Sequence, residues 1–459
     1  MITGGIPMTE KMTKEELLAK AMKPNEDAMK LHPFYRGKIE ITPKACVRTF
    51  DDFAIWYTPG VAAPCKEIEK NKDLVFQYTN KWNTVAVVSD GTRVLGLGNI
   101  GPEAAMPVME GKAMLFKYLG GVDAYPICLD TRDPDELIKT VKLLKPSFGG
   151  INLEDIEKPK CFYILDTLRA DKEIDIPVWH DDQQGTATIV VAGAINALKL
   201  VGKKIKDAQI TMIGAGAANI AISRVLIAAG ATKGNIIMCD SKGIMNAQRK
   251  DLEADKNNNP LKWDMAVNAN AEQREGGKKE ALKDADICLA ASKPGPGTVT
   301  PEEVRGMADK SIVFATANPV PEIWPWEAKE AGAYIVATGR SDFPNQINNS
   351  LGFPGIFRGT LDVMAKTITD EMCIAAALEI AQTAEDNGIH EEYIVPTMDE
   401  WEVFPREAVA VGTKAIEQGI ARRKASRQTL MDEAMEIIRK SRDQTKLLMK
   451  EGFIAKAPE

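Results

Sequence analysis

A run of strand-forming residues passes directly into a glycine turn near the middle of the chain, and this unit limits the possible folds more than any other feature. Gln209-Ile-Thr-Met-Ile213 is followed at once by Gly214-Ala-Gly216-Ala217-Ala-Asn219 and then by a helical stretch, Ile220 to Ala229. The first glycine permits a tight turn, the second lets a pyrophosphate approach the backbone, and the helix N-terminus presents N–H groups. The unit therefore predicts a Rossmann-type, doubly wound parallel sheet that binds a dinucleotide.

Strand-like and helical segments alternate around this unit. Strands are expected at residues 84–88, 209–213, 235–239, 285–290, 311–315 and 334–337, with helical stretches between them. Such alternation is typical of an α/β fold. A helical pattern dominates after about residue 366, with an apolar stripe at Leu430, Ala434 and Ile437. We expect an N-terminal α/β domain over residues 1–180, a dinucleotide-binding domain over 181–385 and a C-terminal helical segment over 386–459.

The same unit indicates which residues contact the dinucleotide. Asp240, at the end of the next strand, is placed to accept a hydrogen bond from a ribose hydroxyl, whereas Lys242 could pair with a 2′-phosphate, so NAD and NADP both remain open. Asn219 stands where a third glycine or an alanine is usual, and we expect it to crowd the helix against the strand. A glycine turn without a cofactor is the alternative. The expected contacts are Gly214, Gly216, Ala217, Asn219, Asp240 and Lys242.

Composition excludes several classes of protein. The 459 residues are 44% hydrophobic, which suits a folded chain, and 58 basic against 65 acidic residues give a net charge of −7, which argues against a nucleic-acid partner. No apolar window reaches the roughly 18 residues that a membrane span needs. The seven cysteines include no Cys-x-x-Cys pair, which favours a reduced, cytoplasmic protein over a zinc or disulfide framework.

Two acidic pairs follow apolar, strand-like stretches just before the glycine unit. They are Glu154-Asp155 and Asp181-Asp182. Each pair alone could be a solvated loop or a helix cap, but loops at strand ends often build binding sites. Oxygen ligands of this kind suit a hard cation, Mg²⁺ or Mn²⁺. His180, directly before the second pair, is either a further ligand or a hydrogen-bonded structural histidine.

Lys112 lies on the apolar face of an expected helix that runs from Pro102 to Leu119. At 100° per residue, the side chains within about 60° of it are apolar: Ala105, Val108, Met109, Leu115, Phe116 and Leu119. A lysine there must extend to solvent, pair with an acid or lose its proton, and burial would lower its pKa towards that of a useful base. Pro107 interrupts the pattern, so the first turn could be a separate segment.

Seven motifs, taken together, resemble malic enzymes of the small, bacterial type. In chain order they are Trp56-Tyr57-Thr58-Pro59-Gly60-Val61-Ala62, Asp90-Gly-Thr-Arg93 to Gly101, Glu110-Gly-Lys112-Ala113, Asn152-Leu-Glu154-Asp155, His180 to Thr186, Ala317-Asn318-Pro319 and Asn345-Gln-Ile-Asn348-Asn349. The resemblance implies an N-terminal catalytic domain beside the dinucleotide domain. It also implies oxidative decarboxylation of L-malate to pyruvate and CO₂, with reduction of NAD or NADP and dependence on Mg²⁺ or Mn²⁺.

The resemblance also implies roles for individual residues. Lys112 matches the general base and Asp181 the carboxylate paired with it, while Tyr57 matches the acid that protonates enolpyruvate. The expected metal ligands are Glu154, Asp155 and Asp182. Substrate binding is expected from Arg93, Asn318 and Asn348, of which Asn318 would also contact the cofactor and Arg93 matches the larger eukaryotic type.

A homodimer is expected because family members are generally dimeric or larger, and in small members the partner chain can complete an active site. A malolactic enzyme, which releases lactate and keeps its NAD bound, is the first alternative function. A noncatalytic dinucleotide-sensing protein is the second, although it would give no reason for Lys112 on an apolar face or for the two acidic pairs.

Overall fold

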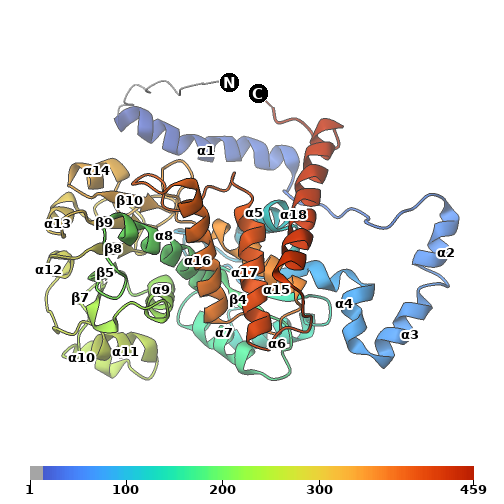
Figure 1. Cartoon of the computed structure of the whole chain (residues 1–459), viewed down its shortest axis with the longest axis horizontal. Coiled ribbons are helices and arrows are strands. Elements are labelled where there is room, and N and C mark those ends of the chain that lie inside the picture. Colours follow the sequence, from blue (N-terminus) through green and yellow to red (C-terminus); the bar gives the residue numbers. More distant parts are fainter. Residues whose placement is uncertain (1–13, 459) are drawn as a thin grey trace.

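The computed structural model describes residues 14–458, which form two parallel sheets with helices packed around them (Figure 1). The first sheet has the strand order β2-β1-β3-β4, and every neighbouring pair is parallel. Its strands are β1 (Thr84–Ser89), β2 (Asp123–Cys128), β3 (Gly150–Leu153) and β4 (Val178–His180). Apolar β-branched residues make β1 suited to a position between two neighbours, and all six of its residues are buried.

The second sheet has the order β10-β9-β8-β5-β6-β7 and is parallel except for β7, which pairs antiparallel with β6. Its strands are β5 (Ile210–Ile213), β6 (Ile236–Asp240), β7 (Gly243–Ile244), β8 (Ile287–Ala290), β9 (Ile312–Ala315) and β10 (Ile335–Thr338). The five strands predicted here are confirmed with ends shifted by at most two residues, whereas β7 was not predicted. The expected α/β fold class is confirmed.

Eight α-helices precede β5 in the described part of the chain. They are α1 (Lys14–Tyr35), α2 (Phe53–Trp56), α3 (Ala62–Lys70), α4 (Val75–Tyr78), α5 (Pro102–Gly120), α6 (Pro134–Leu144), α7 (Lys160–Ala170) and α8 (Thr186–Leu200). Pro107 lies inside a continuous α5, so the expected separate first turn is wrong. The proline removes one hydrogen bond, the one to the carbonyl of Glu103, and the helix tolerates this loss near its start.

The remaining helices lie around the second sheet and return to the first. They are α9 (Ala217–Ala228), α10 (Lys250–Ala254), α11 (Pro260–Asn268), α12 (Lys278–Leu282), α13 (Pro301–Arg305), α14 (Pro325–Glu330), α15 (Phe353–Asp362), α16 (Asp370–Asn387), α17 (Val403–Glu417) and α18 (Arg427–Lys450). Within residues 14–458, no helix is long and apolar enough to cross a membrane.

The C-terminal helices pack on the core of the first sheet. Phe353 and Phe357 of α15 lie in one apolar cluster with Val85 of β1 and Leu430 of α18. Helix α16 joins the two halves, because its residues 372–376 belong to this cluster and its residues 377–381 to the core of the second sheet. On α18 the buried stripe is Leu430, Ala434 and Ile438, so the expected Ile437 is only half-buried.

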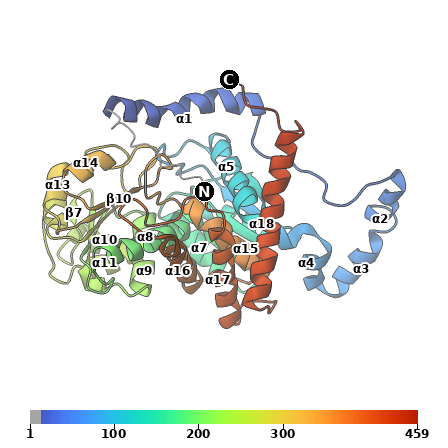
Figure 2. The same ribbon diagram turned by 45° about the horizontal axis from the view of Figure 1, so that its top comes forward.

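An arm formed by residues 50–70, which include α2 and α3, stands away from the body of the molecule in both views of the chain (Figures 1 and 2). Its side chains are unusually apolar for an exposed segment, and Phe50 is 91% exposed. Helix α1 runs along another side, where the hydroxyl of Tyr35 donates a hydrogen bond to the carbonyl of Ala455 at 2.8 Å. The arm therefore presents apolar side chains that the rest of the described chain does not cover.

Candidate active site

A cleft of about 1750 Å³ lies where the carboxyl ends of strands from both sheets face each other. This is the place where open parallel sheets bind their ligands. Twelve of the residues predicted to form the site line it: Arg93, Lys112, Glu154, Asp155, Asp182, Gly214, Gly216, Ala217, Asp240, Lys242, Asn318 and Asn348. Side chains from six of the seven motifs, together with the glycine unit, therefore meet in one cleft.

Lys112 is held between two carboxylates at the base of this cleft. Its Nζ lies 2.5 Å from Asp181 Oδ2 and 3.1 Å from Glu154 Oε1, and it lies 4.3 Å from the centre of the Phe353 ring. The three charged side chains are 8%, 0% and 5% exposed respectively. The chain passes so close to Asp181 that a Cβ at Gly185 would lie 1.8 Å from Asp181 Oδ1. Only glycine fits there.

Burial and ion pairing act in opposite directions on Lys112. Burial lowers its pKa, but Asp181 and Glu154 raise it further, and the net pKa lies above the ordinary value. The expectation that burial would lower the pKa of Lys112 is therefore wrong. It considered burial alone and did not include the two acidic side chains that pair with the lysine. Burial also raises the pKa of Glu154, against the opposing charge of Lys112.

Asp155 and Asp182 place a second concentration of negative charge beside this pair. The main-chain N–H of Asp155 donates to Asp182 Oδ2 at 2.9 Å, and Asp155 itself has a left-handed φ of 55°. Its Oδ1 accepts a hydrogen bond from the N–H of Leu95 at 3.2 Å, whereas its Oδ2 is buried without a partner. Burial and the charge of Asp182 raise the pKa of Asp155 to about 8.

These carboxylates suit a hard cation in their chemistry. A buried, unpartnered carboxylate oxygen next to a second carboxylate is stabilised by a bound cation. In the part of the chain that the structure describes, however, no three acidic, histidine or cysteine side chains are already arranged as a metal-binding group. His180 is fully buried, and neither ring nitrogen makes a hydrogen bond within the described chain, although Nδ1 lies 3.7 Å from Asp182 Oδ2. Burial lowers its pKa, so it is neutral.

The glycine unit has the geometry that a dinucleotide requires. Gly214 has a φ of 104°, and a Cβ there would lie 2.6 Å from the carbonyl oxygen of Ala291. A Cβ at Gly216 would meet nothing within 4 Å, so the backbone is open to a ligand. The amide of Asn219 donates to the carbonyls of Ile213 at 3.0 Å and Gly214 at 2.8 Å. Asn219 therefore fastens the turn rather than crowding the helix, and it does not line the cleft.

The cleft wall includes the three residues predicted to bind the substrate, Asn318, Asn348 and Arg93. The Oδ1 of Asn348 accepts the N–H of Ser350 at 3.0 Å and its Nδ2 donates to the carbonyl of Gly339 at 2.9 Å, which leaves one amide N–H. Arg93 is exposed, and its guanidinium donates to the carbonyl of Leu95. Asn348 and Arg93 can therefore each donate a hydrogen bond to a substrate carboxylate.

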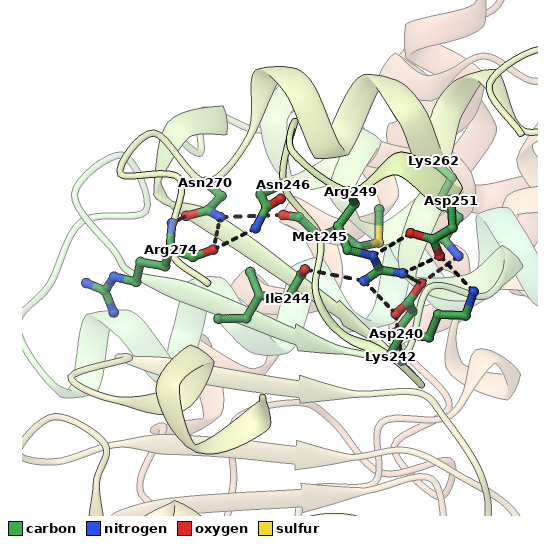
Figure 3. Close-up of polar contacts among 10 residues, drawn as sticks. All are labelled: Asp240, Lys242, Ile244, Met245, Asn246, Arg249, Asp251, Lys262, Asn270 and Arg274. Carbon is green, nitrogen blue, oxygen red and sulfur yellow. Dashed lines mark hydrogen bonds and ion pairs between the residues drawn. The ribbon is translucent and has the colours of Figure 1, made fainter. Parts of the chain in front are cut away.

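Three site residues had no recognisable signal in the sequence. Glu322 is buried and accepts hydrogen bonds from the N–H groups of Ser292 at 2.8 Å and Ala317 at 3.0 Å, and burial raises its pKa to about 7. Arg249 and Lys262 surround Asp240, while Lys242 pairs instead with Asp251 at 2.9 Å (Figure 3). Each is a single charged residue outside any recognised motif, so no local pattern marks them.

Tyr57 is the one predicted catalytic residue that the chain does not bring to the cleft. It directly follows α2 in the arm and is 71% exposed. Asp181 does not line the cleft either, but it contacts Lys112, which does.

The fold and the site together define a class of protein. A doubly wound sheet whose glycine turn opens onto the same cleft as a buried lysine and several carboxylates is the arrangement of a dinucleotide-dependent oxidoreductase. The family model described as malic enzyme, N-terminal domain matches residues 36–169, and the one described as malic enzyme, NAD binding domain matches residues 183–416. The chain belongs to the malic enzyme family.

Individual relatives agree with this assignment. A bifunctional malic/malolactic enzyme of Bacillus subtilis is 50% identical over 397 residues, covering 86% of this chain and 94% of the relative. An NADP-dependent malic enzyme of Escherichia coli is 43% identical over 453 residues, covering 95% of this chain and 58% of the relative. The crystal structure of Entamoeba histolytica malic enzyme is 46% identical, with a TM-score of 0.95 and coverage of 98% and 93%. The resemblance found in the sequence is confirmed.

Proposed function

We propose that the protein catalyses the oxidative decarboxylation of L-malate to pyruvate and CO₂, with reduction of NAD or NADP and with Mg²⁺ or Mn²⁺. The observation that carries this proposal is the position of Lys112, held by Asp181 and Glu154 next to the crowded pair Asp155 and Asp182. A noncatalytic dinucleotide-binding protein would have no use for so many buried charges, each of which opposes folding unless it is compensated.

Different residues of the chain carry out different parts of this reaction. Lys112 takes the proton of the C2 hydroxyl, and bound NAD or NADP would accept the hydride from C2. Asp181 orients the lysine and stabilises the ammonium group that forms. Arg93, Asn318 and the free N–H of Asn348 bind the carboxylates of malate. The glycine turn holds the pyrophosphate, with the N-terminus of α9 facing it.

The cation site is formed by Glu154, Asp155 and Asp182. A bound Mg²⁺ or Mn²⁺ would polarise the C2 oxygen of the substrate and offset the carboxylate charge that keeps Lys112 protonated. Support comes from the buried, unpartnered Oδ2 of Asp155 and from the raised pKa of that residue.

Tyr57 is proposed to act in the cleft of a second copy of the chain. The arm that carries it also exposes Phe50 (91%), Ile55 (58%) and Trp56 (51%), and exposed apolar groups of this extent mark a surface that another protein covers. In a symmetric homodimer each arm would reach the other body, so that Tyr57 donates the proton to enolpyruvate there. The seven free cysteines suit a reducing compartment such as the cytoplasm.

The deciding experiment is an absorbance assay for reduced cofactor with malate, a dinucleotide and added Mg²⁺ or Mn²⁺. We expect reduced cofactor and pyruvate to appear in equal amounts and to depend on the cation. Malolactic activity is the second candidate, because a relative of 50% identity is named for both activities. Lactate formed without net cofactor reduction would replace the proposed reaction with that one. Binding of dinucleotide without any turnover of malate would refute both.

A further inference from the structure

Asp240, at the end of β6, lies inside a cluster of charged side chains on the wall of the cleft (Figure 3). Its Oδ1 accepts hydrogen bonds from the main-chain N–H of Lys242 at 2.9 Å and from Arg249 Nη1 at 3.1 Å. Its Oδ2 accepts from Arg249 Nη2 at 3.2 Å and from Lys262 Nζ at 2.9 Å. A carboxylate has about four acceptor positions. The protein itself therefore occupies all the acceptor positions of Asp240.

This saturation bears on the choice between NAD and NADP. An acidic residue at this strand end selects NAD by accepting a hydrogen bond from the free ribose 2′-hydroxyl. Asp240 could accept that bond only by releasing Arg249 or Lys262. Those two bonds join groups of opposite charge, whereas the ribose hydroxyl is neutral. Although burial raises the pKa of Asp240, the bonds from Arg249 and Lys262 hold it below its ordinary value. The carboxylate is thus a stable, ionised partner of its neighbours.

The cluster carries an excess of positive charge towards the cleft. Lys242, Arg249 and Lys262 contribute three positive charges against the two negative charges of Asp240 and Asp251, and Asp251 does not line the cleft. A fourth cation, Lys158, lines the cleft beside them. Burial lowers the pKa of Lys158, and the positive charge of Lys262 lowers it further. A phosphate group of charge about −2 would offset this excess of positive charge.

The hydrogen-bond donors of the cluster point to the same ligand. In the described chain, Lys262 and Lys242 each donate one side-chain hydrogen bond out of three available, to Asp240 and Asp251. Arg249, by contrast, uses its donors on Asp240, Asp251 and the carbonyl of Ile244. Free donors therefore belong to the two lysines, while Arg249 keeps Asp240 occupied.

We infer that the enzyme selects NADP over NAD, with Lys262 and Lys242 binding the 2′-phosphate and Arg249 as a positioning residue that keeps Asp240 from the ribose. This inference rests on the dinucleotide site of the proposed function. The specificity then depends on Lys242, Arg249 and Lys262, which lie 2 to 22 positions after Asp240. Of these three, only Lys242 was among the contacts expected from the sequence.

Binding measurements test the inference without requiring turnover. The full-length protein is titrated by calorimetry with adenosine 2′,5′-bisphosphate and with 5′-AMP, and by nucleotide fluorescence with NADPH and NADH. We expect the 2′-phosphorylated member of each pair to bind at least about tenfold tighter. Equal or weaker binding of that member would overturn the inference. A preference for the bisphosphate without malate turnover would contradict only the proposed activity, whereas malate turnover without that preference would contradict only this inference.

Variants locate the selectivity. Lys242→Ala combined with Lys262→Ala should weaken NADPH binding about tenfold or more and change NADH binding by less than about threefold. Lys250→Ala is the matched control, because Lys250 is 86% exposed on α10 and pairs with Glu253. Arg249→Met should shift the ratio of affinities towards NADH, since it frees two acceptor positions of Asp240, and Arg249→Lys should restore part of the preference. Equal losses for both nucleotides in these variants would reduce the cluster to a structural role and refute the assignment.

Discussion

Lys112 shows how residues distant in the sequence decide the charge of a side chain. Asp181, the acid that contacts it most closely, lies 69 positions later, and Glu154 reaches it from the end of β3. Helical periodicity alone placed Lys112 correctly on a buried face, because that pattern depends only on the helix itself. Its partners come from other parts of the chain, so helical periodicity predicts the position of the lysine but not its protonation state.

The first prediction concerns the role of Lys112 as the base. Lys112→Ala should lower kcat for malate oxidation by about 10²- to 10⁴-fold, because proton abstraction loses its acceptor. Dinucleotide affinity should remain, since the glycine turn is built from a separate sheet. Steady-state kinetics and a nucleotide titration measure the two effects. Lys117→Ala is the control on the same helix, where Lys117 pairs with Asp123 at 2.7 Å. More than about a tenth of the activity in Lys112→Ala would exclude the role.

The second prediction concerns the pH dependence of stability at Asp155. Its pKa rises from 3.8 to about 8 on folding, so folding favours the protonated form and stability is lost as the pH rises through that interval. Without divalent cation, Asp155→Asn should therefore raise the Tm near pH 8 and flatten its fall with pH. Asparagine keeps the acceptor for the N–H of Leu95 and tolerates the positive φ.

Thermal denaturation at several pH values in the presence of a chelator measures this effect. Asp166→Asn, an exposed change on α7, provides the control. A Tm below that of the unsubstituted protein at every pH would show that the ionised carboxylate is stabilised by groups of the chain itself.

At the scale of elements, Glu322 connects the segments that follow β8 and β9. Its two oxygens accept the N–H groups of Ser292 and Ala317, and both segments line the cleft. Glu322→Gln replaces one acceptor with an amide N–H₂, which then faces a buried N–H donor. We expect a loss of about 1–3 kcal/mol in stability and a higher KM for malate, because Asn318 follows Ala317 directly.

Thermal denaturation and kinetics together check the Glu322 prediction. Glu327→Gln is a suitable comparison, since Glu327 accepts one main-chain N–H, that of Trp324, at the start of α14. An unchanged KM despite a lowered Tm would mean that Glu322 supports the fold without positioning the site.

Elements were predicted well where a pattern was long enough to be periodic. The strands of the second sheet are marked by apolar β-branched runs such as Ile210–Ile213, and their ends agree within two residues. Strand β7 has two residues, and α10, α12 and α13 have five each, which is less than two helical turns. Segments this short show no periodicity and owe their shape to tertiary contacts. Arg249 lies among them, which explains why it was missed.

At the scale of the whole molecule, the arm separates Tyr57 from the remaining site residues. A prediction follows for mixtures of inactive variants. Tyr57→Phe and Lys112→Ala should each be nearly inactive alone, but mixed dimers would contain one site with both residues intact. After exchange of subunits, roughly a quarter of the original activity should return. Tyr78→Phe, on the half-exposed face of α4, is the control and should remain active. No recovery in mixtures with proven subunit exchange would place Tyr57 outside the partner's site.

The path of the chain has a consequence for how such enzymes can be recombined. The apolar face of the first sheet is covered by α15, α17 and α18, which follow the second sheet in the sequence. The core of the first sheet is therefore built from segments that lie before and after the second sheet in the chain. A chimera that joins the N-terminal half of this chain to a foreign dinucleotide domain would leave that face bare. A workable exchange would have to leave α15, α17 and α18 on the first sheet, and it would also have to respect α16, whose residues contribute to both cores.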